Sequence, residues 1–125
     1  MIEVPFERLK GKTLVSIGGD KDTDITFTTS NGEQFLMTHE QECCEKVYLA
    51  EIIGDLNCLL NRPLLMAEKI TNAPFTHATI KTDESLDWEE WTFYKLATSK
   101  GYVTLRWYGV SNGYYSTGVS FYRSK

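Results

Sequence analysis

The chain has 125 residues, enough for one domain that buries roughly 65% of its unfolded surface. Its hydrophobic and charged fractions, 42% and 24%, are those of an ordinary globular protein and exclude a disordered chain. The longest aliphatic run, residues 64–67, is too short to span a bilayer, and no secretion signal follows Met1. We therefore expect a single domain that contacts no membrane and stays in the cytoplasm.

The net charge of −4 is unevenly distributed. Residues 1–90 carry all 17 acidic residues against 8 basic ones, a net charge of −9, and residues 91–125 carry +5. Ten of the 16 aromatic residues also fall in residues 91–125. This pattern is typical of a surface with a basic, aromatic part and an acidic part, and equally of two halves that attract each other within one fold.

Three strands are predicted first, at residues 13–17, 24–29 and 34–39. Ile25 and Phe27 alternate with threonines, as in a half-buried strand. Asn31-Gly32 tolerates the positive φ that a tight hairpin turn needs, so the three strands should form a meander.

The middle of the chain is less regular. Residues 47–53 are rich in strand-forming residues, although their apolar spacing also suits a helix, and we interpret them as a strand. Asp55 is a typical N-cap residue and Pro63 ends the following apolar stripe, which predicts a short helix over residues 55–61. Residues 64–71 resemble a further strand.

Three β-prone runs follow, at residues 91–98, 102–108 and 114–122, and predict a second meander. Side chains alternate along a strand. One face of the central strand then carries Val103, Leu105 and Trp107, which Val119 and Phe121 should join. The opposite face carries Tyr102, Thr104, Arg106 and Tyr108, together with Tyr114, Ser116, Ser120 and Tyr122 of the last run. The expected fold is mostly β, of the α+β type: two antiparallel meanders forming a sandwich or a strongly curled sheet, with one or two short helices.

The polar face of the second meander is the candidate binding surface. Tyrosine rings supply contact area or stack on bases, and arginine forms forked pairs with carboxylate or phosphate. The predicted partner-binding residues are Lys95, Tyr102, Arg106, Tyr108, Asn112, Tyr114 and Tyr115. The same residues also fit a structural role, as cross-strand pairs that shelter the sheet.

A second candidate surface is acidic. It consists of Asp83, Glu84, Asp87, Glu89 and Glu90. Such a run before a strand is usually a solvated loop, but it also offers a partner a mimic of nucleic acid.

Patterns for catalysis and metal binding are weak. No nucleophile stands beside a base and no glycine-rich phosphate loop is present, so we expect a binding protein without a cofactor and not an enzyme. His39, Cys43 and Cys44 are zinc-ligand types, but adjacent cysteines on a strand would point in opposite directions. Three cysteines also make a poor disulfide framework, which favours a reducing cytoplasm.

Several segments resemble a small family of phage- and prophage-encoded proteins known only as a domain of unknown function. The resemblance covers roughly residues 11 to 122 and rests on residues 11–13, 42–48, 54–56, 91–98, 100–109 and 111–116. It implies no catalytic residue. It does imply a viral or mobile-element context, in which small accessory proteins often inhibit host defence by direct binding.

We therefore expect a phage-type accessory protein that inhibits a bacterial defence system by binding one of its protein components. Three alternatives remain: sequestration of a nucleotide signal by the arginine and tyrosine face, a metal-stabilised module or enzyme centred on His39, Cys43 and Cys44, and a minor virion component. An exposed aromatic sheet also fits a homodimer interface.

Overall fold

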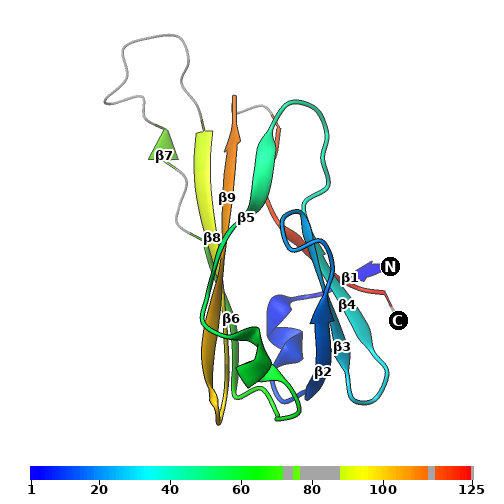
Figure 1. Ribbon diagram of the computed structural model, residues 1–125. Coiled ribbons are helices and arrows are strands. Elements are labelled where there is room, and N and C mark those ends of the chain that lie inside the picture. The colour runs from blue at the N-terminus through cyan, green and yellow to red at the C-terminus, as the bar shows by residue number, and fades with distance from the viewer. Residues whose placement is uncertain (72–74, 77–87, 113–114, 125) are drawn as a thin grey trace.

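The computed structural model describes residues 1–71, 75–76, 88–112 and 115–124. Within this part of the chain, two antiparallel sheets stand face to face (Figure 1). The expectation of a mostly β fold with two antiparallel sheets is confirmed. The helices described are two single turns, the 3-10 helices η1 (Phe6–Leu9) and η2 (Leu56–Leu59), and no described helix is long and apolar enough to cross a membrane.

We call the two sheets sheet 1 and sheet 2. Sheet 1 has the order β1 (Ile2–Glu3), β10 (Ser120–Arg123), β4 (Gln34–Thr38), β3 (Asp24–Thr29) and β2 (Leu14–Gly18). Sheet 2 has the order β5 (Lys46–Ile53), β9 (Gly101–Ser111), β8 (Trp88–Thr98) and β6 (Met66–Thr71), with β7 (Phe75–Thr76) also paired to β8.

The first meander forms as expected. Strands β2, β3 and β4 are consecutive neighbours, and Phe27 lies opposite Phe35 while Ile25 lies opposite Met37. All four of these side chains are buried. Gly32 has a positive φ of 91° in the turn between β3 and β4, where we expected a residue that tolerates it.

The middle of the chain also follows the prediction in kind. Residues 46–53 form strand β5, with a bulge between Leu49 and Glu51. The carboxylate of Asp55 caps η2 by accepting a hydrogen bond of 2.9 Å from the backbone N–H of Asn57. The helix is one turn long, shorter than the predicted residues 55–61.

The second meander needs a correction. β8 and β9 form a long hairpin, but the strand on the other side of β9 is β5, with Tyr48 opposite Tyr108. The last run crosses to sheet 1, where β10 pairs with β4 and β1, and Phe121 lies opposite Met37. Ser120 and Tyr122 therefore lie in a different sheet from Arg106.

The crossing is made by residues 115–119. Thr117 packs against the backbone of Gly109, where an added Cβ would lie 2.7 Å from the Thr117 Cβ atom, and its hydroxyl donates to Glu90 at 2.6 Å. Strand propensity predicted one strand over residues 114–122, but in the described part of this run the strand is confined to β10, and residues 115–119 are irregular. The sheet that β10 joins is determined by burial. Phe121 packs against the rings of Phe27 and Phe35 of sheet 1 and of Phe6 on η1.

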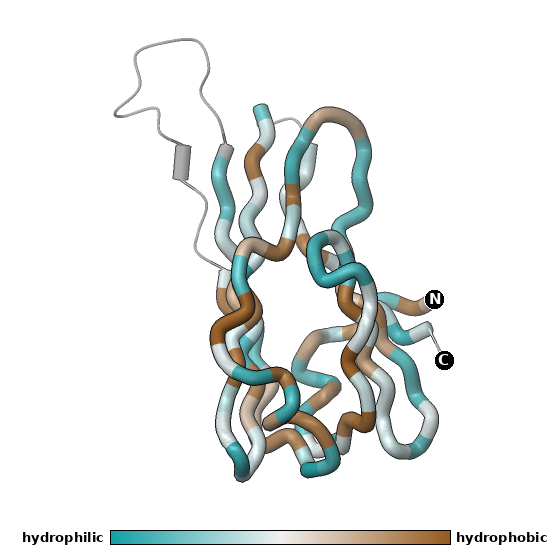
Figure 2. The backbone as a smooth tube through the Cα atoms, viewed as in Figure 1, coloured by the Kyte–Doolittle hydropathy of each residue, from teal (hydrophilic) through white to brown (hydrophobic). Residues whose placement is uncertain are grey.

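The core lies between the sheets. Hydrophobic and polar residues alternate along the strands, as Figure 2 shows by changes of colour along the tube. Val103, Leu105 and Trp107 are buried as predicted, and the Trp107 indole N–H points at the sulfur of Met37 at 3.2 Å. Phe121 contacts the rings of Phe6, Phe27 and Phe35 and joins the core from sheet 1.

Candidate functional site

The face of sheet 2 that points away from sheet 1 is the candidate site. Because Val103, Leu105 and Trp107 point into the core, the residues between them point outward. We call this surface the outer face. It comprises Lys46, Tyr48, Glu51 and Ile53 of β5; Tyr102, Thr104, Arg106, Tyr108 and Val110 of β9; Glu89, Trp91, Phe93, Lys95 and Ala97 of β8; and Met66, Glu68 and Ile70 of β6.

An aromatic row crosses the outer face. Strand register places Tyr48, Tyr108 and Trp91 side by side on β5, β9 and β8. The ring centroids of Tyr48 and Tyr108 are 5.8 Å apart, and those of Tyr108 and Trp91 are 4.6 Å apart. The Tyr108 hydroxyl donates to the carboxylate of Glu89 at 2.5 Å. These contacts hold the three rings in a fixed arrangement.

Arg106 stands in the next row. Its guanidinium carbon lies 4.7 Å from the centre of the Trp91 ring, a cation–π distance, and its Nη2 atom lies 2.8 Å from Glu51. The side chain is 36% exposed, while its Nε atom is buried. Arg106 is therefore oriented by its neighbours and reaches solvent, as the alternation predicted, but part of its charge is already paired.

The charges of the outer face balance. It carries three basic residues, Lys46, Lys95 and Arg106, and three acidic residues, Glu51, Glu68 and Glu89. Arg106 pairs with Glu51, and Lys95 lies directly opposite Glu68 in the register of β8 and β6. The outer face is thus close to neutral on a chain whose net charge is −4.

Large apolar side chains on this face are exposed. The exposed fractions are 73% for Tyr102, 48% for Ile53, 43% for Ile70 and 41% for Tyr48. They stand on three different strands, β9, β5 and β6. A monomeric protein rarely keeps such a patch uncovered, so the arrangement suits contact with another molecule.

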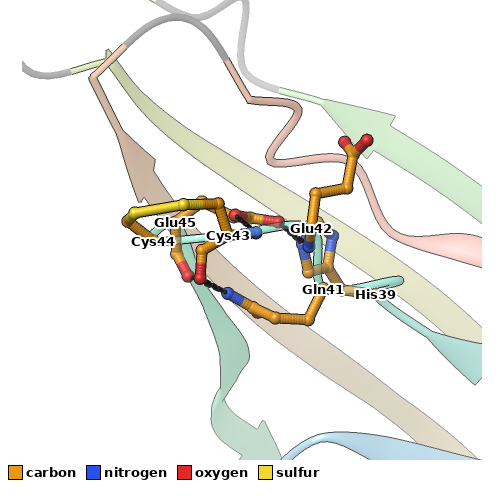
Figure 3. The surroundings of a disulfide bond; sticks show 6 residues. All are labelled: His39, Gln41, Glu42, Cys43, Cys44 and Glu45. Carbon is orange, nitrogen blue, oxygen red and sulfur yellow. Dashed lines mark hydrogen bonds and ion pairs between the residues drawn. A yellow bond between two sulfur atoms is a disulfide. The ribbon is translucent and has the colours of Figure 1, made fainter.

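A second polar cluster lies in the loop between β4 and β5, at residues 39–45 (Figure 3). The carboxylate of Glu45 is buried and accepts three hydrogen bonds, from the backbone N–H groups of Glu42 at 2.8 Å and Cys43 at 2.9 Å and from His39 Nε2 at 2.8 Å. The Gln41 amide donates to the backbone oxygens of Glu45 and Cys43. The loop is therefore closed around one carboxylate.

The hydrogen bonds set the charge of Glu45. Burial alone would raise the pKa of this carboxyl, but the three donors outweigh it and hold the pKa at about 2, below the usual 4.5. His39 Nδ1 also faces an acceptor, the backbone oxygen of Gly118 at 2.7 Å. Each ring nitrogen of His39 therefore lies within hydrogen-bond distance of an oxygen atom, and the ring links the Glu45 carboxylate to the backbone of Gly118.

This geometry bears on the metal hypothesis. Both ring nitrogens of His39 are engaged, and the structure joins Cys43 to Cys44 by a disulfide bond (Figure 3). The cysteines lie in a loop and not on a strand, so our expectation that they point in opposite directions was wrong. Among the residues that the structure describes, no group of three His, Cys, Asp or Glu side chains is placed to hold a metal ion.

The family model of DUF7448, a domain of unknown function, matches residues 7–121. The chain belongs to this family. No curated protein and no solved structure matches it.

The DUF7448 match spans the strands that build the outer face, β5 to β9, and the crossing to sheet 1. Four predicted partner-binding residues, Lys95, Tyr102, Arg106 and Tyr108, lie together on that face. Two others, Asn112 and Tyr115, lie beyond the end of β9, where they line a cavity of about 310 Å³ with Lys46 and Cys44. Tyr114 lies outside the described residues.

Two of the five residues of the predicted acidic surface of this DUF7448 chain can be placed. Asp83, Glu84 and Asp87 lie outside the described residues. Glu89 and Glu90 are neighbours on β8 and point to opposite faces, Glu89 to Tyr108 on the outer face and Glu90 to Thr117 between the sheets. The described pair therefore does not form one acidic patch.

Two of the three rings of the aromatic row, Tyr48 and Trp91, were not predicted from the sequence. Phe93 and Ile70 extend the apolar surface along the next row. Alternation along β8 alone would have grouped Trp91, Phe93 and Lys95, which is the signal that was available. The position of β5 beside β9 carried no local signal.

Proposed function

We propose that this chain is a binding protein whose outer face docks on a protein partner. The observation that supports the proposal is the aromatic row of Tyr48, Tyr108 and Trp91, with Arg106 stacked on Trp91. Tyrosine, tryptophan and arginine are the residue types that contribute most binding energy at protein interfaces. Here they are held in place by ring contacts and an ion pair, so little side-chain entropy is lost on docking.

The balance of charges favours a protein over a nucleic acid. Binding to a phosphate backbone needs an excess of lysine and arginine on one face, because counterion release supplies most of the affinity. The outer face has equal numbers of basic and acidic residues, and Arg106 already forms an ion pair with Glu51. A partner with a mixed or apolar protein surface fits it better.

The context of the proposal comes from the resemblance to phage- and prophage-encoded proteins. In that context we propose that the partner is a protein component of a bacterial defence system, which the chain inhibits by covering it in the host cytoplasm. The chemistry of the outer face supports binding to a protein. Inhibition of the defence system is tested in cells.

The test compares two double variants of the same residue types. Arg106→Ala with Tyr108→Ala alters the outer face, and Arg123→Ala with Tyr122→Ala alters sheet 1 as a matched control. Each would be expressed in cells that carry defined defence systems and scored for phage plating. A partner found by affinity capture would be purified and its binding measured by calorimetry.

We expect the outer-face variant to lose protection of the phage and to bind the purified partner at least about 100-fold more weakly, since two hot-spot residues are removed. The control should behave as the unmodified chain. Far-ultraviolet circular dichroism and a cooperative denaturant transition confirm that both variants are folded. Full binding by a folded outer-face variant would sink the proposal.

A further inference from the structure

We infer that the outer face of sheet 2 is covered by the same face of a second copy of this chain when no partner is bound. The inference rests on the proposed function, because it assigns a resting state to the same interface. A partner would then bind by displacing the second copy.

Electrostatic repulsion between two copies of the outer face should be small. Two identical faces that each carried a net charge would repel each other. The charges of the outer face cancel one another. Arg106 and Glu51 are 2.8 Å apart, and Lys95 lies opposite Glu68 in the strand register. The chain as a whole is acidic, at −4, so this is a region where a second copy approaches with little repulsion.

The outer face is large enough for a dimer interface. Strands lie about 4.8 Å apart and rise about 3.3 Å per residue, so four strands over the span from Tyr102 to Val110 outline on the order of 500 Å². Two such faces together bury about 1,000 Å² or more, which reaches the size of a specific interface.

The exposed apolar residues are spread across the whole width of the outer face. Tyr48 and Ile53 stand on the edge strand β5, Tyr102 on the central strand β9, and Ile70 on the far strand β6. A contact that covers them all must span the whole width of the sheet. A sheet face of equal width meets this requirement, and a second copy supplies one by two-fold symmetry.

The experiment is sedimentation velocity on the purified full chain at about 1 to 100 μM, a range that resolves micromolar dimers. The expected species has twice the chain mass of 14.3 kDa. Because the face is neutral, raising the salt from about 0.05 to 0.5 M should change the dimer dissociation constant less than about threefold.

Matched substitutions locate the interface. Ile70→Lys places an ammonium group in the contact twice, once per copy, and should weaken the dimer at least about 100-fold. Val15→Lys is the control, since Val15 is also 43% exposed but lies on β2 of sheet 1. Ile53→Lys, on β5, repeats the test at the other edge of sheet 2.

A wild-type chain that stays at 14.3 kDa at every concentration overturns the inference, as does a dimer weakened equally by Val15→Lys and Ile70→Lys. The two proposals fail separately. A monomer whose partner binding is lost in the Arg106 and Tyr108 variant refutes only the dimer. A dimer broken by Ile70→Lys, with partner binding unaffected by the outer-face variant, refutes only the proposed function.

Discussion

Glu45 shows how one buried side chain organises a loop. Its two oxygens accept hydrogen bonds from Glu42, Cys43 and His39, and His39 continues to the backbone oxygen of Gly118 in the crossing segment. The contacts of Glu45 and His39 therefore connect the loop before β5 with the residues that lead into β10. Removing either partner leaves buried polar groups without compensation.

Acid should weaken the protein through this carboxyl. The folded pKa, about 2, lies below the usual value of 4.5, so the contribution of Glu45 is fully present above about pH 4.5 and is lost as the pH falls towards 2. Glu45→Gln removes the charge at every pH. We expect its guanidinium midpoint to be lower than that of the unmodified chain at pH 7 and to change less between pH 4.5 and 2.

Glu42→Gln is the matched control, because Glu42 is an exposed carboxylate in the same loop. It should keep the midpoint at pH 7 and the full acid sensitivity. If Glu45→Gln and the unmodified chain show the same dependence on pH, the Glu45 carboxylate is not the cause of the loss of stability in acid.

Gly109 is a second residue with a defined role. The crossing segment approaches it so closely that a Cβ atom would lie 2.7 Å from Thr117, and Thr117 in turn bonds Glu90. Gly109→Ala should therefore displace Thr117 and destabilise the fold by about 1–3 kcal/mol. Urea unfolding followed by tryptophan fluorescence measures the change.

Gly18→Ala controls for the loss of a strand glycine. Gly18 lies in β2, has no positive φ, and an added Cβ would meet nothing within 4 Å. Its free energy of unfolding should stay within about 1 kcal/mol of the unmodified chain. Equal effects of the two substitutions would show that the close approach at Gly109 is not what matters.

At the scale of elements, local signals identified strands well. Alternating residues and turn residues predicted β2, β3 and β4 together with their order, because consecutive strands joined by tight turns pair with each other. The same reasoning found the β8–β9 hairpin and placed Arg106 and Tyr108 outward. Which residues form a strand, and which of its side chains share a face, can be read from the sequence of that strand alone.

Pairing across long connections was not predictable in this way. β5 is the neighbour of β9, some 50 residues further along the chain, and β10 leaves its sequence neighbour β9 to lie between β4 and β1. Both choices follow from which faces bury the most apolar surface, a property of the whole core. The candidate site was therefore half predictable: the residues of β9 and Lys95 were found, and Tyr48 was not.

At the scale of the whole molecule, the two ends of the chain close sheet 1. β10 lies between β1 and β4, and Phe121 contacts Phe6, Phe27 and Phe35, which come from three other segments of the chain. The last strand therefore takes an interior position, between β1 and β4, in a sheet whose other members come from the first 38 residues. Stability should depend on this late element as much as on the early hairpin.

Phe121→Ala tests that dependence. It removes a ring that is 4% exposed and stacked on Phe35 at 5.4 Å, and should lower the free energy of unfolding by about 3–5 kcal/mol in a denaturant titration. Ile2→Ala, on the adjacent strand β1, is the control, since Ile2 is 71% exposed and its loss should change stability by no more than about 0.5 kcal/mol. A small effect of Phe121→Ala would mean that the sandwich is held together without its last strand. The outer face, which belongs to sheet 2, would then form without a contribution from the packing of β10 in sheet 1.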